Sequence, residues 1–286
     1  MKSLILSLAA LFVLGFAMSS FQDQKTKSEI TICHSLPTDM ADFVSDPEFV
    51  KMHPSPVGFK FDKLGKEISF KTPDGKTAGA YFIKAKTKSD KWLFVYQEWW
   101  GLNDHIRQES DKFYNDFAGK VNVIALDMYD GKLADNPTDA GKLMQGADQA
   151  RLANIIKGAY DYAGKKATVA SVGWCFGGGL SLRSALAGGT QNVGSVMYYG
   201  MPVQDIEQLK TLNSDVLGLF ATEQWISKEV IEEFASNMKK ADKKLTYKIF
   251  PGVHGFANPS NPKYDAENTK IAYDMALDYL KDRLAI

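Results

Sequence analysis

The fold is decided by the stretch Thr168-Val169-Ala170-Ser171-Val172-Gly173-Trp174-Cys175-Phe176-Gly177-Gly178. Its first five residues form an apolar run that predicts a strand, and the G-x-C-x-G pattern that follows is typical of a strand-to-helix turn carrying a nucleophile. The glycines are needed because side chains at their positions would collide with the neighbouring strand and helix. With cysteine at the nucleophile position, the pattern predicts acyl transfer through a thiolate.

The same motif has a purely structural alternative. Cys175 would then be a small buried hydrophobic residue, since free cysteine is among the most buried residue types. The glycines would then serve only close packing at a helix start. Short motifs give many false matches, so the choice depends on whether the rest of the chain supplies a base and an orienting group.

Length and composition fit a globular protein. The chain has 286 residues, enough for one large domain or two small ones. Lys plus Arg and Asp plus Glu are both 34, so the formal net charge is zero. A nucleic-acid-binding protein usually shows a basic excess, and we expect no nucleic-acid partner.

The N-terminus predicts export. Lys2 precedes an apolar run over residues 4–17, and Ala17 and Ser19 supply small residues near a cleavage point. This pattern is typical of a secretory signal peptide, which we assign to residues 1–20. The alternative is an uncleaved anchor, although the run is short for a spanning helix. We expect a periplasmic or secreted protein with no stable membrane insertion after cleavage.

Export makes the two cysteines, Cys33 and Cys175, a possible disulfide pair. We do not expect the bond, because a nucleophile turn points the Cys175 sulfur into a cleft. Cys33 lies in a polar leader with no evident reason to reach it. The sequence alone leaves the pairing open.

The remaining chain divides into a leader and one domain. Residues 21–63 are expected to wrap the domain, and four prolines between residues 22 and 59 predict irregular structure. Residues 64–286 form the domain. Its predicted strands are Glu67–Lys71, Ala80–Ala85, Trp92–Gln97, Val121–Leu126, Thr168–Val172, Val193–Tyr199, Val216–Ala221 and Leu245–Phe250. Its predicted helices are Asp104–Ala118, Thr138–Ala163, Phe176–Ala187, Lys228–Lys240 and Tyr264–Leu284.

This order predicts an α/β fold. An antiparallel start followed by strand and helix alternation favours a mostly parallel eight-stranded sheet with helices on both faces. Ligands of such sheets bind at the carboxyl ends of the strands. Functional residues are therefore expected directly after strands.

A base and an orienting group are available at such positions. His254 follows the last strand in a glycine-flanked loop and is well placed to draw the thiol proton. Glu223 and Gln224 follow the strand Val216–Ala221, and either side chain can accept a hydrogen bond from the imidazole. Only the carboxylate would also stabilise an imidazolium. His34, His53 and His105 are given low priority, although His105 could line the cleft.

Glu98 is the other notable titratable residue. It ends an apolar strand beside two tryptophans, where desolvation would raise its pKa, and it could exchange a proton with the thiol. The alternative is a carboxylate paired with Arg107 or another cation. The backbone N–H groups of Trp99 and Phe176 are expected to flank the sulfur, as an oxyanion requires.

The motifs occur in a recognisable order: Gln97-Glu98-Trp99-Trp100-Gly101-Leu102-Asn103, Asp127-Met128-Tyr129, Gly173-Trp174-Cys175-Phe176-Gly177-Gly178 and His254-Gly255-Phe256. From about Ile68 to Leu284 the chain resembles the dienelactone hydrolase (carboxymethylenebutenolidase-like) family, which implies the α/β-hydrolase fold. The resemblance implies Cys175 as nucleophile, His254 as base, Glu98 as thiol activator, and Trp99 and Phe176 as oxyanion donors. We expect the substrate to contact five neighbouring residues: Trp100, Tyr129, Lys132, Trp174 and Phe256.

The chain departs from the family pattern at two places. The triad aspartate of the family falls at Gln224, with Glu223 adjacent. Two arginines that hold a substrate carboxylate are replaced in regions containing Lys132 and Asn258, and only the lysine can act as a positive charge. A dienelactone is therefore not the expected substrate.

These observations predict a hydrolase of small esters or lactones that needs no metal and no cofactor, as a monomer or homodimer. A non-catalytic ligand-binding protein with the same pocket is one alternative. A redox sensor that uses the Cys175 thiol is another. Only the hydrolase predicts turnover that Cys175→Ala abolishes.

Overall fold

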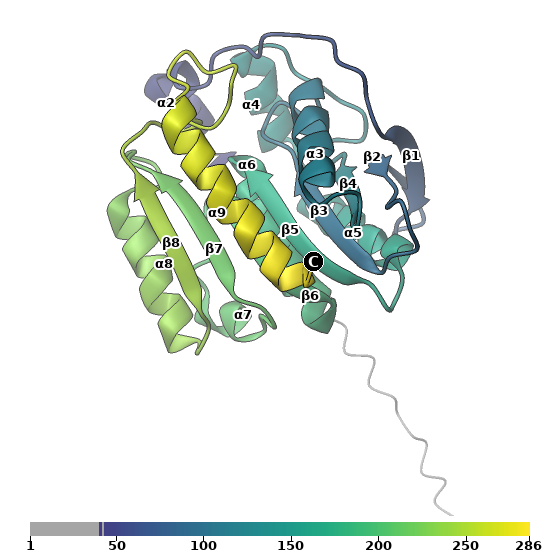
Figure 1. The fold of residues 1–286 in the computed structure, drawn as a ribbon. Coiled ribbons are helices and arrows are strands. Elements are labelled where there is room, and N and C mark those ends of the chain that lie inside the picture. Colours follow the sequence, from purple (N-terminus) through teal and green to yellow (C-terminus); the bar gives the residue numbers. More distant parts are fainter. Residues whose placement is uncertain (1–39, 42) are drawn as a thin grey trace, which may run out of the picture. The chain divides into compact units, whose positions relative to one another are not determined.

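A computed structural model describes residues 40–41 and 43–286 of the chain. Within these residues, eight strands form one sheet in the order β1-β2-β4-β3-β5-β6-β7-β8 (Figure 1). The strands are β1 (Lys66–Lys71), β2 (Thr77–Ile83), β3 (Lys91–Tyr96), β4 (Asn122–Leu126), β5 (Thr168–Trp174), β6 (Asn192–Tyr198), β7 (Val216–Ala221) and β8 (Leu245–Phe250).

The pairing of the strands confirms the predicted fold class. β2 is antiparallel to both β1 and β4, whereas every pair from β4 through β3 to β8 is parallel. The carboxyl ends of the parallel strands therefore meet at one edge of the sheet. Tyr96 of β3 is level with Gly173 of β5, and Ala221 of β7 is level with Phe250 of β8.

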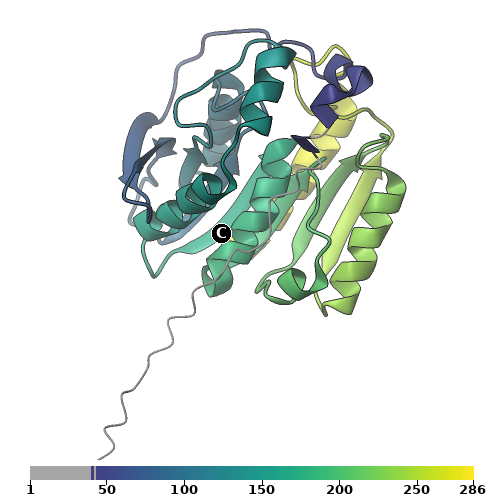
Figure 2. The same ribbon diagram turned by 180° about the vertical axis from the view of Figure 1, so that it is seen from behind.

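Helices cover both faces, as the sequence predicts. α3 (Asp104–Asp116) and α9 (Ala266–Leu284) lie on one face, and α5 (Gln149–Ala163) and α6 (Phe176–Gly188) lie on the other (Figures 1 and 2). Strand side chains alternate between the faces because successive Cβ atoms of a strand point in opposite directions. Val95 joins the apolar cluster that contains residues of α3 and α9, whereas Phe94 joins the cluster that contains residues of α5. The shorter or peripheral helices are α4 (Pro137–Gln145), η2 (Gly189–Gln191), α7 (Ile206–Lys210) and α8 (Lys228–Lys240).

The single helix predicted over Thr138–Ala163 is wrong, because the segment forms α4 and α5 instead. Gly146 closes α4, and the Asp148 carboxylate accepts a hydrogen bond from the Ala150 N–H at 2.9 Å to cap the start of α5. An aspartate at this position satisfies an otherwise unpaired backbone donor and favours a new helix start. Because the apolar spacing continues across the break, the sequence pattern indicates one helix where the structure has two.

The prediction of irregular structure between residues 22 and 59 is also wrong in part. The segment contains η1 (Phe43–Ser45) and α2 (Pro47–Lys51), and Asp46 caps α2 by accepting from the Glu48 N–H at 2.9 Å. Residues 1–20 and Cys33 lie outside the described residues, so the signal peptide and the disulfide question stay predictions. Over residues 40–41 and 43–286, no helix has the length and apolar character needed to cross a bilayer.

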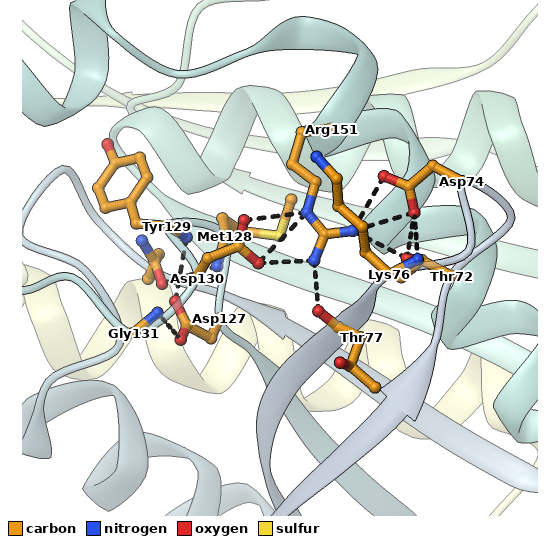
Figure 3. A network of polar contacts seen from close by, with 11 residues as sticks. Thr72, Asp74, Lys76, Thr77, Asp127, Met128, Tyr129, Asp130, Gly131 and Arg151 are labelled. Atoms are coloured by element: carbon orange, nitrogen blue, oxygen red, sulfur yellow. Dashed lines mark hydrogen bonds and ion pairs between the residues drawn. The ribbon is translucent and has the colours of Figure 1, made fainter.

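A buried arginine fixes the loop that follows β4. Figure 3 shows the Arg151 guanidinium between Asp74 and Asp130, and it also donates to the Thr77 carbonyl at 2.6 Å. Asp127 accepts from the Tyr129 N–H at 3.0 Å in the same loop. Since α5, the β1–β2 turn and this loop share one guanidinium, the position of Tyr129 depends on Arg151.

Candidate active site

The backbone at Cys175 has the tight turn that the sequence predicts. Cys175 follows β5 with φ 56°, a conformation that is uncommon outside glycine. A Cβ on Gly173 would lie 2.1 Å from the Gly177 carbonyl oxygen, and one on Gly177 would lie 2.4 Å from the Tyr96 carbonyl oxygen. The predicted steric need for glycine at both positions is thereby confirmed. The Cys175 thiol is buried and forms no disulfide with another described residue.

Glu223 is the hydrogen-bonding partner of His254. The Nδ1 atom of His254 lies 2.8 Å and 2.9 Å from the two carboxylate oxygens of Glu223. The side chains are 0% and 2% exposed, so water does not screen the pair. Gln224 is exposed and has no hydrogen bond to His254. The two candidate partners therefore differ, because only the carboxylate faces the imidazole.

The remaining nitrogen of His254 faces the cysteine side. His254 Nε2 has no hydrogen-bond partner among the described residues, and a ligand nitrogen of His254 lies within 4.8 Å of Cys175 Sγ. Burial by itself lowers the pKa of His254, but the Glu223 carboxylate and the Cys175 sulfur outweigh it and raise that pKa well above its usual value. The site thus favours an imidazolium beside the sulfur.

His53 enters the site from the leader, which the sequence analysis gave low priority. Its Nε2 atom lies 3.7 Å from Cys175 Sγ, and its Nδ1 lies 2.7 Å from the Phe49 carbonyl oxygen. Burial, and then the charge of His254, lower the pKa of His53 well below its usual value. His53 is therefore a neutral imidazole next to the thiol.

Phe49 of α2 covers the two imidazoles. Its ring centroid lies 4.3 Å from that of His53, 6.0 Å from that of His254 and 5.6 Å from that of Trp99. Trp225 adds a further edge contact, and its Nε1 donates to Asp46 at 2.9 Å. Phe49 is 0% exposed, Cys175 1% and His254 1%. The segment Asp46–His53, which we call the cap, closes over the site.

Glu98 interacts electrostatically with His254 and accepts a hydrogen bond from a neutral side chain. Its Oε2 accepts from Asn258 Nδ2 at 2.7 Å, whereas Arg107, the cation weighed as its partner, pairs with Glu67 at 2.8 Å. Burial raises the pKa of Glu98 to about 7, against smaller opposing effects of His254 and Asn258. Glu98 can therefore hold or release a proton near neutral pH.

The two predicted oxyanion donors lie in segments that follow β5 and β3. Phe176 is the first residue of α6, where a backbone N–H has no acceptor within the helix. Trp99 follows Glu98 after β3, and its ring packs 4.5 Å from that of His53 and 5.1 Å from that of Trp100. Because β3 and β5 are paired, both residues come from the loops at the same edge of the sheet.

The other residues predicted to contact the substrate do not all lie in one pocket. Tyr129 stacks on Phe176, and exposed Lys132 lines a pocket together with Tyr129 and Arg151. Trp174 stacks on Tyr198, with Phe113 of α3 as its other ring neighbour, so its ring contacts lie in the core. Trp100 and Phe256 are buried, and Phe256 packs against Tyr199 and Phe250.

Tyr199 is a site residue that the sequence analysis missed. It follows β6 with φ 35°, and its ring meets that of His254 edge-on at 5.0 Å. The hydroxyl is buried and has no partner among the described residues. Burial, then the charges of Glu98 and Cys175, raise its pKa well above the usual value, so it is a neutral donor. Its place at the end of a strand was the one available sequence signal.

Known proteins resemble this chain in sequence. The sequence profile of the dienelactone hydrolase family matches residues 78–284. A candidate carboxymethylenebutenolidase of Aquifex aeolicus (strain VF5) is 27% identical over 240 residues, which cover 77% of this chain and 100% of the relative.

Solved structures share the fold. A dienelactone hydrolase from Anabaena variabilis superposes with a TM-score of 0.56 at 16% identity, over 77% of this chain and 98% of that chain. A dienelactone hydrolase-like promiscuous phosphotriesterase from metagenomic libraries gives a TM-score of 0.66 at 19% identity, over 77% and 98% of the two chains. At these identities the likeness shows the fold alone.

Proposed function

The chain belongs to the dienelactone hydrolase family, and from this premise we propose that it hydrolyses small carboxylic esters or lactones with Cys175 as the nucleophile. The observation that carries the proposal is the orientation of His254. Glu223 holds its Nδ1, and this leaves Nε2 to exchange a proton with the Cys175 sulfur.

The reaction starts with the thiol proton. His254 Nε2 takes it, and Cys175 Sγ attacks the carbonyl carbon of the ester. The oxygen becomes negative and is stabilised by the backbone N–H groups of Trp99 and Phe176. When the carbon–oxygen bond breaks, the alcohol leaves with the proton from His254, and a thioester remains on Cys175.

Water completes the cycle. His254 takes a proton from water, the resulting hydroxide attacks the thioester carbonyl, and the carboxylic acid leaves as Sγ takes the proton back. Glu223 holds the imidazole in one tautomer and stabilises its charged form in both halves. In this proposal Glu98, which accepts a hydrogen bond from Asn258, exchanges a proton with the thiol at rest.

The surroundings favour an uncharged substrate. Asn258 occupies a region where the resemblance places an arginine, and its amide bonds to Glu98 instead of facing an open pocket. Lys132 is exposed and lines a different pocket with Arg151. A small neutral ester therefore suits the site better than a carboxylate-bearing lactone.

The covalent intermediate tests the proposal. Protein mixed with para-nitrophenyl acetate and quenched in acid should carry one acetyl group on the Cys175 peptide, and the adduct should decay as the ester is exhausted. The Cys33→Ala variant is the matched control, since it keeps Cys175 as its only cysteine. Absence of both adduct and product would support the ligand-binding alternative instead.

We also propose that residues 1–20 are removed on export. N-terminal sequencing of protein recovered outside the cytoplasm tests this cleavage, and an intact Met1 in that material would contradict it.

A further inference from the structure

We propose that His53, Cys175 and His254 form a binding site for a thiophilic divalent cation, best matched by Zn²⁺. Cation binding itself is independent of the proposed function. The consequence for turnover rests on it, because a cation on the sulfur removes the nucleophile from the reaction.

Both imidazoles would direct Nε2 toward a cation at the sulfur, His53 as the neutral ring and His254 once its Nε2 proton has left. The Phe49 carbonyl oxygen can only accept, so the contact at 2.7 Å places a proton on His53 Nδ1 and leaves Nε2 as the acceptor. Glu223 holds Nδ1 of His254 in the same way. Outer hydrogen bonds of this kind, from a carbonyl or a carboxylate, are typical of histidines that bind metals.

One shared proton does not satisfy the sulfur and both ring nitrogens. Whether this proton is on Cys175 Sγ or on His254 Nε2, it can bridge only two of the three atoms. His53 Nε2 lies 3.7 Å from the sulfur, and His254 Nε2 has no partner among the described residues. Buried polar groups in proteins are rarely left unpaired. One cation in place of the proton would bond the sulfur and both nitrogens together.

The spacing suits a tetrahedral ion. The three ligand atoms lie within 4.8 Å of one another. Bonds of about 2.3 Å to sulfur and about 2.0 Å to nitrogen, at a tetrahedral angle, put these two ligand atoms about 3.5 Å apart. The 3.7 Å between Cys175 Sγ and His53 Nε2 is close to this separation. The three residues leave one position for water or a small anion.

Ligand type and charge point to the same class of ion. A thiolate with two imidazoles suits Zn²⁺ and disfavours Mg²⁺ and Ca²⁺, which prefer oxygen ligands. The thiolate and the Glu223 carboxylate together balance the charge of a divalent ion. His53 lies outside the family-matched residues 78–284, so the cap supplies the third ligand and the ion would tie the cap to the domain.

Cobalt titration tests the site. Chelator-stripped, reduced protein should take up one Co²⁺ per chain, with a thiolate-to-cobalt absorption band that Zn²⁺ displaces. His53→Gln should weaken Co²⁺ binding about 100-fold or more, because a direct ligand matters at least as much as its outer partners. The matched control is His105→Gln, which removes an imidazole bonded to Ser260 instead and should bind as the wild type does.

X-ray absorption of Zn²⁺-loaded wild-type protein keeps the test independent of variant folding. One sulfur and two imidazoles at zinc support the site. The proposed site is overturned by a zinc coordination shell without sulfur or by the lack of a thiolate band at saturating Co²⁺. Equal affinity of His53→Gln and wild type for Co²⁺ would also overturn it.

Turnover separates the two proposals. Zn²⁺ should inhibit ester hydrolysis by wild-type protein, and His53→Gln should need about 100-fold more Zn²⁺ for equal fractional inhibition. If metal-free protein hydrolyses no ester but gives the cobalt band, the proposed function fails and the metal site stands. If wild-type protein hydrolyses esters and Zn²⁺ has no effect, the metal proposal fails alone.

Discussion

Glu223 holds His254 through both of its carboxylate oxygens, at 2.8 Å and 2.9 Å from the same ring nitrogen. The adjacent Gln224, at which the resemblance places the family's triad aspartate, is exposed. A shift of one residue along the loop after β7 therefore keeps a carboxylate on the imidazole. The replaced aspartate by itself is no argument against catalysis.

Glu223→Gln should lower kcat/KM for a small ester roughly 100-fold or more, because the amide can accept the hydrogen bond but cannot stabilise an imidazolium. Gln224→Ala is the matched neighbour and should stay close to wild type. Steady-state kinetics with para-nitrophenyl acetate measure both. Equal losses in the two variants would contradict the assignment of Glu223.

The stability of the protein should depend on the charge of Glu98. Its pKa is raised from 4.5 to about 7 by burial, so the folded state holds a proton that the unfolded chain loses earlier. The free energy of unfolding should therefore fall as pH rises from about 4.5 to 7 and stay reduced above, by about 3 kcal/mol in total.

Glu98→Gln removes this titration. It should match wild-type stability below pH 4.5 and exceed it above pH 7, as urea unfolding at the two pH values would show. Glu233→Gln, at an exposed glutamate of α8, is the control and should give no such pH-dependent gain. A constant difference between Glu98→Gln and wild type at both pH values would be inconsistent with a buried titrating carboxyl.

Removal of the Phe49 ring should open the cap. Phe→Ala at a fully buried site costs about 3–5 kcal/mol, and each 1.4 kcal/mol of local opening is a factor of ten. We expect Phe49→Ala to raise the rate of Cys175 modification by a thiol reagent at least about tenfold. Phe59→Ala is the control, since that ring packs on Phe61 and His105 instead. Unchanged thiol reactivity in Phe49→Ala would mean that the cap does not limit access.

Arg151→Ala should destabilise the whole domain. The guanidinium is 8% exposed and pairs with Asp74 and Asp130, which are 21% and 46% exposed. Removing the arginine breaks both pairs and takes away the donor to the Thr77 carbonyl, and we expect a loss of about 2–3 kcal/mol in thermal or urea unfolding. Lys142→Ala breaks an exposed pair with Asp139 and should cost under about 0.5 kcal/mol. Similar losses in both variants would contradict the role of Arg151.

The sequence was sufficient for the parts of the protein that depend on local pattern. Apolar strands, helix periodicity and the G-x-C-x-G turn led to the eight-stranded sheet and to the position of Cys175. His254 and Glu98 were found because parallel strands end at one edge of the sheet. These rules concern residues close in sequence or adjacent strands.

The contribution of the cap could not be predicted in this way. His53 and Cys175 are 122 positions apart, and their contact depends on the path of a leader that carries no repeating pattern. The break between α4 and α5 had visible signals in Gly146 and Asp148, but continuous apolar spacing outweighed them. The choice between Glu223 and Gln224 depends on loop backbone direction, which spacing does not encode.

The most direct test of the account is the kcat/KM of Cys175→Ala against that of Cys33→Ala for one activated ester, with both proteins purified in parallel. The account predicts that Cys33→Ala keeps wild-type turnover and that Cys175→Ala falls to the uncatalysed background. Turnover retained by Cys175→Ala would contradict the thiol nucleophile.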